Sequence, residues 1–179
     1  IVGINHGTLI NCQFTGVVTG DSEVGGIVGR NESEGTIDHS TARAIVTGKS
    51  STGGIAGYNL GAITGCTNVG SINTEYPEAS LDTDGFTAKM VDYINNKMAA
   101  ADNDATNSVT NVATDTGGIA GRSSGMILTS VNTGTIGYEH VGYNVGGIVG
   151  RTDGLVSGCV NQGRVLGRKD VGGIAGQAE

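Results

Sequence analysis

The hydrophobic positions of this chain lie in short segments that recur in a fixed order. The first segment is a five-residue block, Gly-Gly-Ile-(Ala/Val)-Gly, and a partial copy of it opens the sequence. Full copies of the block lie at residues 25–29, 53–57, 117–121, 146–150 and 172–176. Between the final glycines the steps are 26, 28, 64, 29 and 26 residues. This period predicts a repeat architecture in which each period is one structural unit and one period is enlarged by an insertion.

Two further segments follow the block within each period. The second reads Gly-x-(Leu/Ile/Val)-x-x-(Cys/Ser), with its central apolar residue at Leu9, Ile37, Ile63, Ile127 and Val156. The third has one apolar residue at a matching place, at Val18, Val46, Ile72, Ile136 and Val165. In three periods an Asn-x-Gly turn precedes it, and both Asn and Gly tolerate left-handed backbone angles. Each period is therefore predicted to hold three short β-like segments separated by turns.

No period can bury its apolar side alone, and stacking the periods as coils solves this problem. Equivalent positions would then lie about 4.8 Å apart. The block isoleucines Ile27, Ile55, Ile119 and Ile148 would form one inward ladder. The sequence thus predicts an all-β fold, a parallel β-helix (β-solenoid) of about five coils of 26–29 residues with one helix-containing insertion, and residues 1–179 as a single domain. A propeller blade needs roughly 40 to 50 residues, which this period does not supply.

The cysteines test this stacking. Cys12, Cys66 and Cys159 share one repeat phase with Ser40 and Ser130. Successive cysteines would then be two coils apart, about 9 to 10 Å by the interstrand spacing. That separation exceeds the Cα limit of roughly 7 Å for a disulfide. We therefore expect three free, buried thiols that fill a small inward-facing site.

An insertion at residues 74–108 interrupts the period and differs from the coils in composition. It carries seven acidic residues and two lysines, and so holds five of the chain's seven net negative charges. Phe86, Met90, Ile94 and Met98 recur every four residues. This stripe predicts an amphipathic helix over about residues 86–100.

Two roles remain open for the insertion. Its helix could be a lid over an outward apolar patch of the coils that includes Met126 and Leu128. Alternatively, the insertion could be a partner-binding protrusion, with Tyr76, Phe86 and Tyr93 as candidate partner-binding residues, because aromatic side chains are enriched at binding hot spots. Both roles hold together if the stripe packs inward while the tyrosine-bearing loops face outward.

The outward positions of the second segment form two columns. One column is Thr8, Thr36, Ala62, Met126 and Leu155, and the other is Ile10, Asp38, Thr64, Leu128 and Ser157. A polysaccharide lyase built on a β-helix needs a cluster of carboxylates and bases along one groove, whereas these columns hold Asp38 alone. The pattern predicts a chain that is not an enzyme and has no catalytic residue.

Other motifs that could bind ligands are incomplete. The segment 47–50, Thr-Gly-Lys-Ser, resembles the end of a phosphate-binding loop, but Arg43 stands where its first glycine is required. The triplet Asp82-Thr83-Asp84 lacks the glycine and closing glutamate of an EF-hand loop. His39 with the nearby Cys12 would supply two of the four ligands that a structural zinc needs. We therefore expect no metal and no cofactor.

Composition and charge narrow the picture further. The chain has 33 glycines, one proline, 4% aromatic residues and no tryptophan, so its core must consist of small aliphatic side chains. A net charge of −7 makes nucleic acid an unfavourable partner. No stretch approaches the roughly 18 to 20 apolar residues of a membrane helix, so we expect no membrane insertion. Because both ends fall within motifs, we expect a fragment of a longer protein.

The repeated blocks resemble the Glug motif, and the resemblance covers residues 1–73 and 109–179. This motif occurs in tandem in secreted bacterial proteins, including immunoglobulin-A-cleaving zinc metallopeptidases and adhesin-like surface proteins. The resemblance implies a rigid stalk or adhesin-like segment at the bacterial cell surface or outside the cell, with host protein, glycan or neighbouring domains as partners. The alternative is an accessory segment of a secreted metallopeptidase or other extracellular enzyme, although the His-Glu-x-x-His string of the peptidases is absent.

Overall fold

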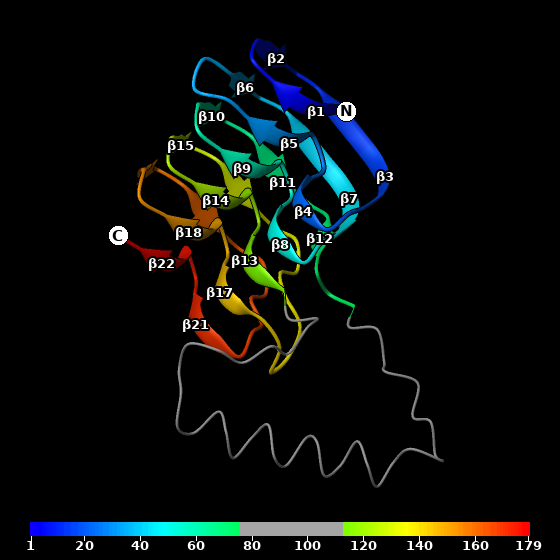
Figure 1. Cartoon of the computed structure of the whole chain (residues 1–179), viewed down its shortest axis with the longest axis vertical. Helices are drawn as coiled ribbons and strands as arrows, with labels where there is room; N and C mark the ends of the chain where they lie inside the picture. Colours follow the sequence, from blue (N-terminus) through cyan, green and yellow to red (C-terminus); the bar gives the residue numbers. More distant parts are fainter. Residues whose placement is uncertain (76–112) are drawn as a thin grey trace, which may run out of the picture. The chain divides into compact units, whose positions relative to one another are not determined.

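The computed structural model describes residues 1–75 and 113–179, which belong to one compact unit. All regular structure in these residues is β-strand, and every strand pairing is parallel. Figure 1 shows the coils following one another from the blue N-terminal coil to the red C-terminal one. The predicted parallel β-solenoid of about five turns is confirmed. Residues 76–112, which contain the predicted helix at 86–100, lie outside the described residues.

Four sheets, named A to D here in the order in which each coil passes through them, make up the described part. Sheet A contains β1 (Val2–Asn5), β5 (Val28–Asn31), β9 (Ala56–Asn59), β14 (Ala120–Ser123), β18 (Val149–Thr152) and β22 (Ala175–Ala178). Sheet B contains β2 (Thr8–Ile10), β6 (Thr36–Asp38), β10 (Ala62–Thr64), β15 (Met126–Leu128) and β19 (Leu155–Ser157).

Sheets C and D complete each coil. Sheet C contains β3 (Gln13–Thr19), β7 (Thr41–Thr47), β11 (Thr67–Asn68), β12 (Ser71–Ile72), β16 (Val131–Asn132) and β20 (Val160–Asn161). Sheet D contains β4 (Ser22–Gly25), β8 (Ser50–Gly53), β13 (Thr114–Gly117), β17 (Tyr143–Gly146) and β21 (Lys169–Gly172). Among the described residues there is no helix with the length and hydropathy to cross a membrane.

The expectation of three β-segments per coil was wrong, because each coil has four strand positions. The extra strand is the one in sheet D, and the glycine block spans the corner between sheets D and A. Sheet D strands lack a hydrophobic alternation, since Thr52 and Thr116 take inward positions that Val24 holds in the first coil. A left-handed residue such as Glu23 (φ 53°) or Ser51 (φ 50°) also interrupts the period of two inside the strand.

The predicted isoleucine ladder is confirmed. The Ile27 amide donates to the Ile55 carbonyl at 3.1 Å, Ile55 to Ile119 at 2.9 Å, and Ile119 to Ile148 at 2.8 Å. All four side chains are 0% exposed. The outward columns of sheet B and the apolar column of the third segment also stack in the expected register. These aliphatic ladders form the core, because each inward side chain is covered from above and below by its repeats.

The glycine block recurs because its positions meet neighbouring backbone, not because they need unusual φ angles. A Cβ at Gly54 would lie 2.3 Å from the Gly118 carbonyl oxygen and 2.4 Å from Cγ of Asn68. A Cβ at Gly57 would lie 2.2 Å from the carbonyl carbon of Glu23. Real Cβ atoms do not approach this closely, so sheets A and D can pack backbone to backbone only where the block has glycine.

The Asn-x-Gly turns work differently from the expectation. None of the asparagines at 68, 132 and 161 has a positive φ. Instead, the Asn68 side chain points inward, accepts from the Gly70 amide at 3.1 Å and donates to Oδ1 of Asn132 at 2.8 Å. Asn132 repeats this arrangement and donates to Asn161 at 2.8 Å. Stacking therefore converts a local turn residue into a buried amide ladder.

Candidate functional site

The three candidate partner-binding residues Tyr76, Phe86 and Tyr93 all lie outside the described residues. The structure does describe the two points where the insertion leaves and rejoins the solenoid. It leaves after β12 in sheet C and returns at Ala113, directly before β13 in sheet D. The insertion is therefore carried by the corner between sheets C and D, which we call the C–D corner.

Length variation between coils concentrates at this C–D corner. From the first residue of a sheet C strand to the first residue of the next sheet D strand, the numbering advances by 9, 9, 47, 12 and 9 positions in successive coils. The B–C and D–A corners keep one length throughout, and the A–B corner is two residues longer in the second coil only. Insertions in repeat proteins collect on one face, which is often the face that binds a partner.

The three-residue extension of the fourth coil forms a defined turn beside the base of the insertion. Tyr138 and Val141 make an isolated antiparallel bridge, and His140 between them is left-handed (φ 59°). The Tyr143 amide that ends this turn donates to the carbonyl of Ala113 at 3.1 Å. Tyr138 is 44% exposed and His140 is exposed as well. In the fourth coil the C–D corner thus presents an aromatic and a titratable side chain, Tyr138 and His140.

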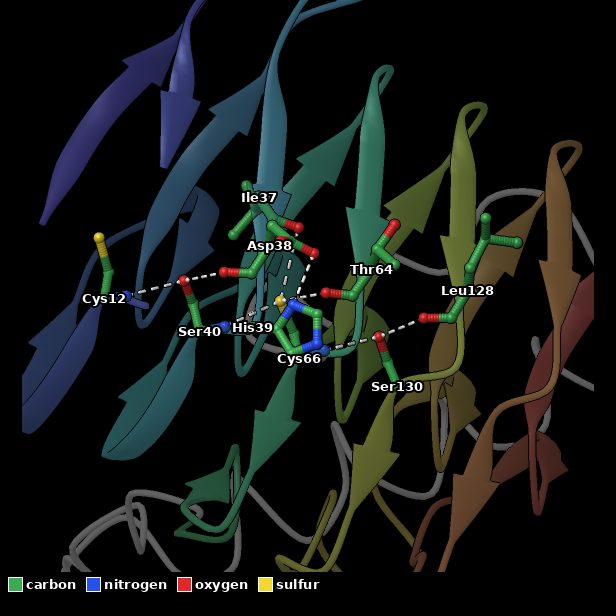
Figure 2. A network of polar contacts seen from close by, with 9 residues as sticks. All are labelled: Cys12, Ile37, Asp38, His39, Ser40, Thr64, Cys66, Leu128 and Ser130. Atoms are coloured by element: carbon green, nitrogen blue, oxygen red, sulfur yellow. Dashed lines mark hydrogen bonds and ion pairs between the residues drawn. The ribbon is translucent and has the colours of Figure 1, made fainter. Parts of the chain in front are cut away.

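The cysteines and serines form a column at the corner between sheets B and C. Figure 2 shows Cys12, Ser40, Cys66 and Ser130 of this column in a line through successive coils. The Cys12 amide donates to Oγ of Ser40 at 3.1 Å, the Ser40 amide to Sγ of Cys66 at 3.4 Å, and the Cys66 amide to Oγ of Ser130 at 3.2 Å. The predicted shared phase is confirmed, and the three thiols are free, as expected. The column therefore orders the corner between sheets B and C.

The expectation that all three thiols are buried was wrong for two of them. Cys66 is fully buried, whereas Cys12 and Cys159 are half-buried. Both lie at the B–C corner beside β2 or β19, the end strands of sheet B, where a neighbouring coil covers them from one side only. The depth of a repeated side chain thus depends on its place in the stack as well as on its phase.

Burial disfavours the thiolate of Cys66, which is the nucleophilic form of a cysteine. Desolvation raises the pKa of Cys66 to about 11, and it also raises the pKa of Cys159. The Cys66 thiol donates to the carbonyl of Thr64 at 3.4 Å and to that of Ile37 at 3.6 Å. Because the thiolate is the reactive species, this arrangement stabilises a hydrogen-bond donor rather than a nucleophile.

The Cys66 thiol should therefore resist alkylation by iodoacetamide in the native protein at pH 8, while Cys12 reacts first because its sulfur reaches solvent. Peptide mapping after timed labelling measures the order. Unfolding without reductant should make three thiols titratable. A Cys66 that labels as fast as Cys12 in the folded protein, or a count of one thiol after unfolding, would contradict this assignment.

His39 lies next to this column at a left-handed corner (φ 46°). Its Nδ1 is 2.9 Å from Oδ1 of Asp38, and its ring covers Gly65, where a Cβ would be 3.0 Å from Nε2. Figure 2 shows the ring in front of Cys66. Within residues 1–75 and 113–179, no group of three or more His, Cys, Asp or Glu side chains is placed to hold a metal ion. The pairing of His39 with Cys12 as metal ligands thus gains no third ligand from the described fold.

The phosphate-loop-like segment at 47–50 is occupied by contacts within the solenoid. The Gly48 amide donates to Oδ1 of Asn73 at 2.8 Å. The amides of Lys49 and Ser50 donate to the Asp21 carbonyl at 2.8 and 3.0 Å, and the lysine ammonium lies 2.6 Å from the Asp21 carboxylate. These donors satisfy the turn and its neighbour in the stack, so they form no phosphate cradle.

One set of outward residues was not predicted from the sequence, which gave Asp38 as the one charged residue in the outward columns. The residue directly after each glycine block points outward from sheet A. These residues are Arg30, Tyr58, Arg122, Arg151 and Gln177. The signal was present in the sequence, because three of the five blocks are followed by arginine. The side chains form a polar strip on a face that the other columns do not reach.

Comparison with known proteins locates a named motif in this architecture. Residues 20–47 match the family model described as the GLUG motif. The match runs from the C–D corner of the first coil through β4, β5, β6 and β7, which is one full turn of the solenoid. No curated protein and no solved structure gave a significant match. The chain is thus a β-solenoid repeat module that contains a GLUG motif at residues 20–47.

Proposed function

We propose that this chain is a non-catalytic structural and interaction module, a rigid stalk or adhesin-like segment of an exported bacterial surface protein. The observation that carries the proposal is the register of the strands, which continues through all four sheets of the described coils. Repeated Ile, Asn, Ser and Gly positions are each occupied by contacts between coils. A scaffold of this kind holds a fixed length and direction, and its repeated positions contribute to stacking rather than to chemistry.

Partner binding in this proposal belongs to the C–D corner. The insertion and the turn at 138–142 leave the solenoid there in consecutive coils, while the other corners keep nearly constant lengths. A rigid scaffold that presents loops at one edge is the common arrangement for recognition. The partner is a host protein or glycan, contacted by Tyr76, Phe86 and Tyr93 of the insertion, or a neighbouring domain of the same polypeptide.

Replacing residues 74–108 with a short Gly/Ser turn tests this proposal. A panel of host proteins and glycans is first tested for binding to the unaltered chain. For each panel member that binds, we expect the variant to bind about tenfold more weakly or worse, because hot-spot residues are removed. The β-sheet circular dichroism and the cooperative unfolding transition should remain, since the described ladders do not include residues 76–112.

A second variant controls for altered corner geometry. Shortening the turn at 138–142 to the length of the fifth coil changes the same corner without touching the insertion. Retained binding after replacement of 74–108 would contradict the assignment to the insertion. A variant that loses the fold would support the lid role instead. Hydrolysis of any panel member by the unaltered chain would overturn the non-catalytic proposal and favour the accessory segment of an extracellular enzyme.

A further inference from the structure

The outer face of sheet A carries one outward side chain per coil in a continuous line. In order along the stack these are Ile4, Arg30, Tyr58, Arg122, Arg151 and Gln177. We call Arg30, Tyr58, Arg122 and Arg151 the arginine strip. Neighbours within it stand on adjacent strands about 4.8 Å apart. Figure 1 shows the strands that carry these residues, β5, β9, β14 and β18, which are neighbours in sheet A in that order.

Tyr58 is the fixed centre of the strip. The guanidinium carbon of Arg30 is 5.0 Å from its ring centroid and that of Arg122 is 5.4 Å away. Its hydroxyl oxygen lies 3.2 Å from Oγ of Ser124. Cation–π contacts of this geometry restrict both arginines. The guanidinium of Arg122 is thus held in place by an aromatic ring before any ligand arrives.

The three arginines differ in how their charge is balanced. Arg30 pairs with Glu23 at 2.9 Å and with Glu32 at 2.7 Å. Arg151 pairs with the carboxylate of Glu179. No carboxylate among the described residues comes within ion-pair distance of Arg122. Arg122 therefore keeps a guanidinium fork that is positioned but has no anionic partner in contact.

Arg122 also stands directly opposite Arg151 in the strand register. Like charges at directly opposed positions of a sheet destabilise it unless an anion lies between or beside them. Asp153 supplies part of that balance, because a hydrogen bond from Ser124 and the charges of both arginines lower its pKa. The group therefore consists of the guanidinium of Arg122, which contacts no carboxylate of the described residues, the guanidinium of Arg151, the exposed carboxylate of Asp153 and the hydroxyl of Ser124.

We propose that the arginine strip binds an acidic saccharide, with a uronate carboxylate on Arg122 and ring hydroxyls on Asp153 and Ser124. A guanidinium fork matches a carboxylate in bidentate geometry. An ionised carboxylate beside it accepts hydrogen bonds from hydroxyl groups. The acidic residues that flank the strip, Glu23 and Glu32 at one end and Glu179 at the other, repel densely charged polyanions. A saccharide with one carboxylate and several hydroxyls per sugar fits a site that, among the described residues, has one free guanidinium and flanking acidic side chains.

This site is separate from the C–D corner and goes beyond the proposed function. Its residues lie on sheet A and at the adjoining A–B corner, which the insertion does not leave from. A result that contradicts binding at the C–D corner therefore does not contradict binding at the arginine strip, and the reverse also holds. Substitutions in the strip do not alter residues 74–108, and replacement of 74–108 does not remove any strip residue.

Calorimetric titration of the full chain with tetragalacturonate at low salt tests the proposal. We expect saturable binding that Arg122→Gln weakens by about tenfold or more, because charge-assisted hydrogen bonds are lost. Arg122→Lys should weaken it as well, since a lysine keeps the charge but loses the fork. Arg43→Gln is the matched control, because Arg43 is an exposed arginine on the outer face of sheet C and should leave binding unchanged. Circular dichroism confirms that each variant is folded.

Comparison ligands decide between a saccharide site and general attraction to acids. The methyl-esterified tetramer should bind at least tenfold more weakly than the free acid. Tetraglutamate should also bind weakly, because it lacks ring hydroxyls for Asp153. Absence of tetragalacturonate binding, equal effects of the Arg122 and Arg43 variants, or equal binding of tetraglutamate would each overturn the proposal.

Discussion

A single methyl group at Gly121 is expected to destabilise this protein by about 3 kcal/mol or more. In Gly121→Ala the new Cβ would lie 2.2 Å from the Thr52 amide nitrogen and 2.3 Å from the carbonyl carbon of Ser51. Both contacts are backbone atoms inside the stack, so no flexible side chain can move away. Sheets A and D would have to separate locally, which strains the ladders on either side. Urea unfolding followed by circular dichroism measures the change.

The chain provides a matched control for this substitution. Gly3 holds the same position of the block in the first coil, but a Cβ there would meet nothing within 4 Å. Gly3→Ala should therefore change the free energy of unfolding by no more than about 0.5 kcal/mol. Equal destabilisation by the two substitutions would show that the effect does not come from contact with neighbouring backbone, which Gly3 lacks. Close approach of sheets A and D would then not be the reason for the repeated block.

The second large effect is expected at Asn31, the centre of a buried amide ladder. Its side chain is 0% exposed, accepts from Nδ2 of Asn5 at 2.8 Å and donates to Oδ1 of Asn59 at 2.8 Å. It also donates to the Gly35 carbonyl at 3.1 Å. Asn31→Leu keeps the branched shape of the side chain but leaves polar groups of both neighbours unpaired in the interior. We expect a loss of roughly 2 to 4 kcal/mol in the free energy of unfolding.

The end of the same ladder calibrates this prediction. Asn5 has a ladder partner on one side only, so Asn5→Leu should destabilise the protein by about half as much as Asn31→Leu. The double variant Asn5→Leu with Asn31→Leu measures the coupling between the two amides. If Asn31→Leu proves neutral or stabilising, the amide ladder is replaceable by an aliphatic one, and its polar contacts are not needed for stability.

Sequence periodicity predicted the features that stacking repeats without change. Ile27 and Ile55 align because a step of one coil returns the chain to the same phase, and the same argument placed Cys12 above Ser40. In a parallel solenoid, equal sequence phase means equal position in space. Inward aliphatic residues and their outward neighbours in sheet B could therefore be assigned from one period and extended to the rest.

Three features were not predicted from the hydrophobic pattern: sheet D, the buried amide ladder of sheet A and the arginine strip. Sheet D was missed because its equivalent inward positions hold valine in some coils and threonine in others, and because its strands contain left-handed residues such as Glu23. The asparagines at 31 and 59 do not stand out in the sequence, and only the stack shows that their amides face each other. The arginine strip was likewise overlooked, although a repeated arginine follows the block.

By itself, the sequence determined the period, the solenoid and the phase of its apolar ladders, because these follow from the spacing of identical residues along one chain. It did not determine how four sheets close around the core, since backbone approach between sheets A and D, as at Gly57 and Glu23, has no counterpart in local spacing. The tertiary structure also decided that loops collect at the C–D corner and that Arg122 stays without a contacting carboxylate among the described residues. The first requires knowing where sheet D begins, and the second requires knowing which side chains of neighbouring coils lie beside Arg122.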